Sequence, residues 1–221
     1  MTPPATVLTA RRWRSRRSAA VAGILFAALL IAALVMLRVA ISGETVESVD
    51  LDPTRRALVR VSLNLVPFAG IAFLWFIGVV RDQLGEVEDR LFSTVFLGSG
   101  LLFLAMLFLG AVTASTLVEM APGGHLDTGI WVYGSGSTET LVSVYAMRMA
   151  AVFTLSVSTV ALRTATVPRW IAISGYAVAL VLLVVAGTYK WAQLVFPVWV
   201  LVLSIAILAT PPARRPDRPE A

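Results

Sequence analysis

Residues 19–41 read AAVAGILFAALLIAALVMLRVAI, an apolar stretch in which Arg38 is the one ionisable side chain. A transmembrane helix needs about 20 such residues to cross a hydrocarbon core about 30 Å thick. The apolar region of a signal peptide is shorter, at about 7–15 residues. We therefore expect this stretch to be retained as a membrane anchor.

Five further apolar stretches follow along the 221-residue chain. The composition agrees with membrane burial, because 58% of the residues are hydrophobic and 14% are charged, against about 25% charged in a soluble domain. We predict an all-α fold, a polytopic transmembrane helical bundle of six spans. The expected spans are residues 19–41, 61–80, 94–118, 141–162, 170–187 and 192–209. For residues 170–209 a re-entrant hairpin remains the alternative to two full spans.

The basic residues predict the orientation of the bundle. With the N-terminus inside, 12 of the 18 basic residues lie in inner segments and four in outer ones, which is the positive-inside bias. We expect a basic cytoplasmic segment at 1–18, a six-helix transmembrane domain at 19–209 and a disordered cytoplasmic tail at 210–221. Both termini are then cytoplasmic.

The composition also excludes several kinds of chemistry. The chain has no cysteine and one histidine, His125, which excludes thiolate catalysis, iron–sulfur clusters and sites built on two histidines. We expect no cofactor and no metal. The net charge of +5 is concentrated before the first span, so it favours contact with anionic lipid rather than with nucleic acid. The arginines concerned are Arg11, Arg12, Arg14, Arg16 and Arg17.

Small residues recur at four-residue spacing within the expected spans. Such ridges allow helix backbones to approach closely, which is how helices associate in lipid. They are Ala19, Gly23 and Ala27, then Gly110 and Ala114, then Ala146, Ala150, Thr154 and Ser158, and finally Gly175 and Ala179. We favour packing within the bundle over homodimerisation as their role.

Arg148 is the charged residue within a span that most needs a partner. A central arginine costs about 2.5–3.5 kcal/mol on insertion scales. In the expected topology its candidate partners Glu119, Asn64 and Glu139 share the outer half of the bundle with it, and Tyr145 lies one turn away on nearly the same face. One hypothesis is an outward-facing polar cluster that binds an anion or a headgroup. The alternative, which we favour, is a structural tie to Glu119 or a side chain that extends to the interface. Arg38 is expected to extend in the same way.

The segment between the third and fourth spans, residues 119–140, is expected to be a long outer loop. It contains the carboxylates Glu119, Asp127 and Glu139 and the flexible string Gly134-Ser135-Gly136-Ser137. Long loops are often functional. Two functions are therefore considered for this loop: contact with a partner, and a lipid-modifying activity that uses these carboxylates.

Two short strings carry a resemblance to a known group of proteins. Residues 91–103 read LFSTVFLGSGLLF and follow a charged inner loop, and Pro168-Arg169-Trp170 precedes the fifth span. In these strings and in its layout the chain resembles small uncharacterised six-span integral membrane proteins of bacteria. The resemblance implies a multi-pass protein of the bacterial cytoplasmic (plasma) membrane and implies no activity.

Three functions follow in order of support. The first is a non-catalytic component or accessory of a membrane complex, bound to a membrane-protein partner or to a second copy. The second is a small permease or lipid-handling protein with a site around Arg148. The third is the lipid-modifying enzyme, which has least support because no nucleophile–base pair is present. We therefore expect no enzymatic activity.

Overall fold

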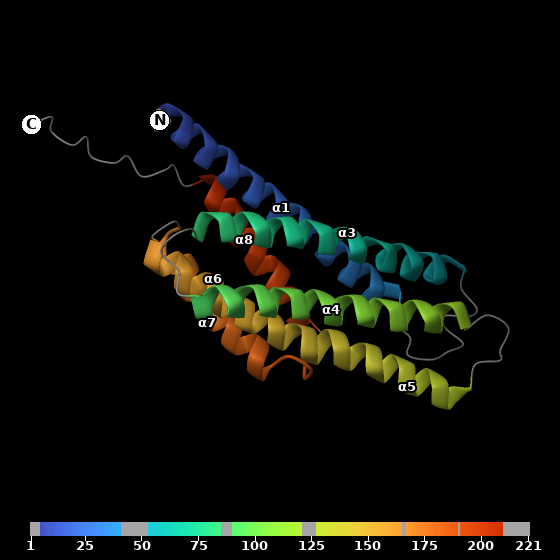
Figure 1. Ribbon diagram of the computed structural model, residues 1–221. Coiled ribbons are helices and arrows are strands. Elements are labelled where there is room, and N and C mark those ends of the chain that lie inside the picture. Colours follow the sequence, from blue (N-terminus) through green and yellow to red (C-terminus); the bar gives the residue numbers. More distant parts are fainter. Residues whose placement is uncertain are drawn as a thin grey trace, which may run out of the picture.

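A computed structural model describes residues 5–40, 53–84, 90–120, 127–164, 167–189 and 191–209 of the chain. Every regular element in these ranges is helical, and the helices lie side by side in one elongated bundle (Figure 1). In chain order they are α1 (Ala5–Ala40), α3 (Pro53–Leu84), α4 (Arg90–Met120), α5 (Thr128–Glu139), the π-helix η2 (Thr140–Ala146), α6 (Met147–Thr164), α7 (Arg169–Val184), the 3₁₀-helix η3 (Ala192–Leu194) and α8 (Val195–Ala209). The predicted helical bundle is confirmed.

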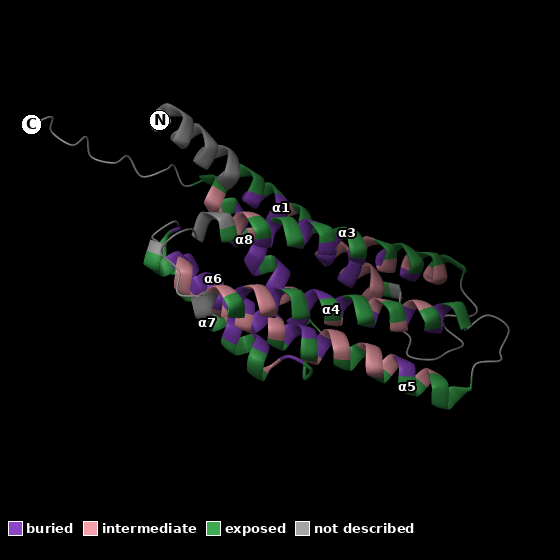
Figure 2. Cartoon of the chain, in the orientation of Figure 1, coloured by how far each residue is buried: buried purple, intermediate pink, exposed green. Residues whose placement is uncertain are grey.

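Five of the described helical segments are long and apolar enough to cross a bilayer. They are Arg17–Val39, Pro53–Arg81, Ser93–Met120, Thr128–Arg163 and Ala192–Ala209. α7 is apolar but has only 16 residues. Large apolar side chains such as Phe68, Trp75 and Leu180 are exposed on the outside of the bundle, and Figure 2 shows exposed residues alternating with buried ones along the helices. Such a surface fits a multi-pass protein embedded in a membrane.

The fourth helical rod is longer than the sequence predicts. α5, η2 and α6 follow one another without a break from Thr128 to Thr164, so the expected loop at residues 128–140 is wrong. Glycine is a poor helix former in isolation, yet Gly134 is buried and packs against the side chain of Leu117 in α4. Packing of α5 on α4 therefore outweighs the weak propensity of the Gly-Ser string.

Local hydrogen bonds support this added helix. Asp127 caps it, because its Oδ1 accepts from the backbone N–H of Gly129 at 2.6 Å. The hydroxyls of Ser135 and Thr138 donate to the carbonyls of Trp131 and Gly134, at 2.7 and 2.9 Å. Asp at the N-cap is a strong helix-start signal, and it lies just before this segment.

Other predictions fall partly or wholly outside the described residues. α1 begins at Ala5, so most of the basic segment at 1–18 belongs to the first helix. The side chains of Arg11, Arg12, Arg14 and Arg16 lie outside the described part, as do His125 and the expected tail at 210–221.

The centre of the bundle is a cluster of phenylalanine rings from five helices. Phe73 in α3 lies at its middle, with ring centroids of Phe26, Phe103 and Phe153 at 4.5, 5.2 and 5.0 Å. Among the side chains that the structure describes, the fully buried phenylalanine rings are Phe26, Phe73, Phe76, Phe96, Phe103, Phe153 and Phe196. Aromatic pairs at these separations attract each other beyond simple area burial, so the cluster joins α1, α3 and α8 to α4 and α6.

The predicted small-residue ridges pack inside the bundle, as we favoured. Gly23 lies so close to Ser204 of α8 that a Cβ there would overlap the serine hydroxyl, and Gly175 stands in the same relation to Ser158. The ridge members in α6 are all fully buried. The small side chains therefore serve close internal contacts.

Successive rods run in opposite directions. Gly23 in α1 faces Phe76 in α3, Gly100 in α4 faces Ile77 and Phe153, and Gly175 in α7 faces Ser158 in α6 and Trp199 in α8. The beginning of α1 and the end of α8 consequently lie at the same end of the bundle (Figure 1).

Candidate functional site

Arg148 lies near the start of α6 and is exposed on the outside of the bundle. Its neighbours in the helix, Met147 and Ala150, are buried in the core, so the helix turns Arg148 away from the interior. No hydrogen bond or ion pair joins Arg148 to any residue that the structure describes. The arginine therefore faces what surrounds the bundle.

Tyr145 is the one predicted neighbour that shares this surface. It lies one turn before Arg148 and its side chain is 53% exposed. It belongs to the π-helix η2, an element seven residues long. π segments are rare and often occur at functional sites. We call Tyr145 and Arg148 together the Arg148 surface.

Glu119 lies at a different height from Arg148. Gly134 of α5 contacts Leu117, and Gly110 of α4 contacts Val142, so Glu119 is level with the middle of α5. About fourteen residues separate that level from Arg148, or roughly 20 Å along the bundle. An Arg148–Glu119 tie is not formed.

Asn64 is likewise separate from Arg148. Gly70 of α3 contacts Phe108 of α4, and Asn64 lies six residues further toward the start of α3. This places it roughly 10–15 Å beyond the level of Arg148. The structure thus brings together two of the four predicted site residues, Arg148 and Tyr145, and all four are exposed.

The outer carboxylates are also dispersed. Asp127 is the N-cap of α5, whereas Glu139 is the last residue of the same 12-residue helix, about 18 Å away at 1.5 Å per residue. Within the described ranges, no three His, Asp or Glu side chains gather as metal ligands would. These carboxylates do not share one site in the described structure.

A polar pair that the sequence reading missed lies where α1 ends. With the Gln193 side-chain amide assigned so that its oxygen faces Arg38, the guanidinium donates to that oxygen from Nη2 and Nε at 3.1 Å each. Gln193 is in η3 and is only 7% exposed. Arg38, expected to extend toward the interface, instead joins α1 to the α7–α8 hairpin. The sequence signal that could have indicated this pair is Gln193 itself, a single polar residue within an apolar stretch.

No family model matches the chain, and the search of curated proteins and that of solved structures each found no significant match. The resemblance to small six-span bacterial membrane proteins therefore stays a prediction.

Proposed function

We propose that the protein is a non-catalytic component of a membrane complex, which binds a partner subunit through the Arg148 surface. The observation that carries this proposal is that the interior of the bundle is apolar, while a charged side chain lies on its membrane-facing surface. The interior is filled by phenylalanine rings, whereas the intramembrane arginine faces outward.

The topology that we propose has six spans with both termini on the cytoplasmic side of the bacterial plasma membrane. Arg17, Arg81, Arg163 and Arg169 share one end of the bundle, at the limits of their apolar helices, as the positive-inside rule requires. α7 has exposed Trp170 at one end, while Tyr189 and Trp191 are exposed beyond the other. Aromatic residues at both limits favour a full span over a re-entrant hairpin.

In this topology Arg148 lies within the outer half of the hydrocarbon core. Fifteen residues separate it from Arg163, which is about 22 Å at 1.5 Å per residue. The Cα of Arg148 is then about 8 Å inside a core about 30 Å thick. Its side chain leans toward the start of α6, and therefore outward. A carboxylate on a partner helix would offset the cost of placing the charge there.

A second copy of the chain fits this surface poorly. A twofold interface places the same patch of each subunit against the other, so two Arg148 side chains would lie within one interface to which Tyr145 and Arg148 contribute no carboxylate. We therefore favour a different subunit that presents an acidic residue at this depth.

The interior gives little support to the permease alternative. The buried hydroxyls of Ser62, Ser99 and Thr154 donate to carbonyls of their own helices. Those of Ser158 and Ser204 have no hydrogen-bond partner among the described residues, but each lies tightly against a glycine of a neighbouring helix, Gly175 or Gly23. A polar pathway would need such groups to face a cavity.

The proposal is tested with a photo-crosslinking amino acid incorporated into the protein at position 145. The crosslinker is activated by light in native membranes. Position 71 of α3 is the matched control, because Ile71 is 54% exposed at nearly the same height. We expect a discrete protein adduct at 145 and none at 71, and loss of that adduct in Arg148→Ala with normal thermal stability. Adducts with lipid alone at both positions would show that Arg148 only extends to the interface.

A further inference from the structure

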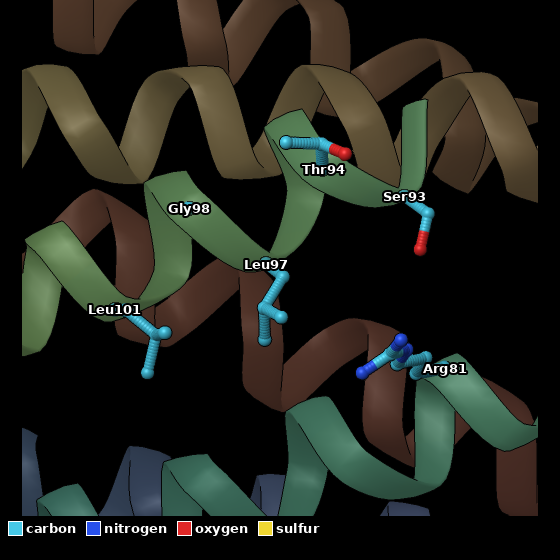
Figure 3. A pocket seen from close by; sticks show the side chains of 6 residues that line it. All are labelled: Arg81, Ser93, Thr94, Leu97, Gly98 and Leu101. Carbon is cyan, nitrogen blue, oxygen red and sulfur yellow. The ribbon is translucent and has the colours of Figure 1, made fainter. Parts of the chain in front are cut away.

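A groove opens between the end of α3 and the beginning of α4, at the end of the bundle where the arginines gather. Its volume is about 440 Å³. One residue of α3, Arg81, lies across from five residues of α4 (Figure 3). Those five are Ser93, Thr94, Leu97, Gly98 and Leu101.

The lining of the groove changes from polar to apolar along α4. In Figure 3 the Arg81 guanidinium and the Ser93 hydroxyl stand on either side of the opening, with Leu97 and then Leu101 further along the helix. Ser93 begins one membrane-length apolar segment and Arg81 ends another. The polar mouth is therefore at the membrane–water boundary, and the apolar floor runs into the hydrocarbon region.

The groove lies beside the packed α3–α4 contact, on another side of α4. Gly100 is tightly packed, since a Cβ there would lie 2.7 Å from Ile77 Cδ1. Gly98 lines the groove and has open space in front of it, because a Cβ there would meet nothing within 4 Å. The missing side chain at Gly98 keeps the floor open.

The charge of the groove selects the occupant. Arg81 is exposed and forms no ion pair with a carboxylate of the described ranges. A guanidinium matches the oxygens of a phosphodiester with two parallel hydrogen bonds, and the Ser93 hydroxyl, which faces Arg81 across the opening, is a further donor. Basic pockets between helices on the cytoplasmic side are suited to anionic headgroups.

We propose that this groove is a binding site for one anionic glycerophospholipid of the inner leaflet. Its phosphate lies between Arg81 and Ser93, and one acyl chain lies along Leu97, Gly98 and Leu101. This site is distinct from the diffuse attraction expected at the N-terminal arginines, because it combines a fixed cation with an acyl-chain floor.

Lipid titration of the full-length protein in mild detergent, read by native mass spectrometry, tests the proposal. The probes are phosphatidylglycerol and phosphatidylcholine with the same acyl chains. We expect one phosphatidylglycerol per chain to bind about ten-fold more tightly than phosphatidylcholine, because both lipids carry the phosphodiester but the quaternary ammonium of choline adds a like charge beside Arg81. Inorganic phosphate at millimolar concentration should not displace it, because it lacks the acyl chain.

Two variants and two matched controls locate the site. Arg81→Gln should abolish the preference for phosphatidylglycerol, and Gly98→Leu should weaken its binding about ten-fold by filling the floor with the charge intact. Arg169→Gln removes another exposed arginine at the same end, and Gly78→Leu fills open space outside the groove. Both controls should bind as wild type does, and thermal unfolding checks that all four variants fold.

Four results would overturn the proposal. Equal losses in Arg81→Gln and Arg169→Gln would mean diffuse attraction to a basic end. Unchanged binding in Gly98→Leu would mean that no chain occupies the floor. Equal retention of the two lipids, or displacement by inorganic phosphate, would exclude an anionic lipid as the specific occupant.

Discussion

The guanidinium of Arg38, at the end of α1, donates two hydrogen bonds of 3.1 Å to the side-chain amide oxygen of Gln193 in η3. The pair joins the first helix to the turn region of the last hairpin, about 150 residues later in the chain. Gln193 is buried, and a buried amide is costly without partners. The pair therefore holds the α7–α8 hairpin against α1.

Arg38→Met should destabilise the protein by about 2 kcal/mol, because it removes charge-assisted hydrogen bonds and leaves a buried amide oxygen without them. Gln193→Leu should cost less, since the freed guanidinium can extend to the interface. The double variant should cost less than the sum of the two, with a coupling above about 0.5 kcal/mol. Unfolding by SDS in mixed micelles, followed by tryptophan fluorescence, measures all three. Additive costs would contradict a direct interaction.

Gly23→Ala should destabilise the α1–α8 contact by about 1–3 kcal/mol, the usual cost of overpacking. The added Cβ would overlap Ser204 Oγ and lie 2.9 Å from a ring carbon of Phe76. Gly78→Ala is the control, since its Cβ meets nothing within 4 Å, and it should be neutral or stabilising by up to about 1 kcal/mol. The same SDS titration compares them. Equal stability of the two variants would show that Gly23 is not a close contact.

Features set by residues close together in the sequence were predictable, whereas features set by contacts between different helices were not. The ridges around Gly23 and Gly175 were predictable, because four-residue spacing brings small side chains to one helix face. The helix at Thr128–Glu139 was not, because contact with Leu117 stabilises it and a Gly-Ser string gives no local signal for that contact.

The candidate site was predictable only within one helix. Tyr145 and Arg148 are one turn apart, so their shared face follows from helix geometry. Glu119 and Asn64 were assigned by their presumed distance from the span ends. That estimate failed because α3, α4 and the fourth rod extend beyond the apolar stretches by different lengths.

Phe73→Ala should be among the most destabilising core substitutions, at about 3–5 kcal/mol. Phe73 is fully buried and has five other rings within 6.2 Å between centroids. Phe68→Ala in the same helix is the control, because Phe68 is 61% exposed and should lose about 0.5 kcal/mol or less. Thermal unfolding in detergent measures the difference. A cost for Phe68→Ala equal to that for Phe73→Ala would contradict the central role of the ring cluster.

Asp127→Ala should loosen the start of α5 by about 1 kcal/mol, because the backbone N–H of Gly129 loses its acceptor. Asp127→Asn is the matched variant, since asparagine caps equally well. Hydrogen exchange of the first-turn amides of α5 should be faster in Asp127→Ala and nearly unchanged in Asp127→Asn. Equally fast exchange in the wild type would mean that the segment is the loop expected from the sequence.

Thr188→Cys tests whether α7 and α8 cross the membrane. The natural chain has no cysteine, so a membrane-impermeant maleimide reports on one introduced thiol without background. Thr188 is exposed in the turn after α7. In two full spans the turn reaches the outer boundary, and Thr188→Cys should react in intact cells as readily as Gly136→Cys in α5.

The alternative topology gives the opposite labelling pattern. In a re-entrant hairpin the turn would end within the hydrocarbon core, where the thiol is protonated and poorly reactive, because low polarity disfavours the thiolate. Thr188→Cys would then remain unlabelled from both sides, whereas Ser93→Cys should react only after permeabilisation. Since Arg38 binds Gln193 close to this turn, a re-entrant hairpin would also bury that charge, which is costly. Labelling from outside is therefore the result we expect.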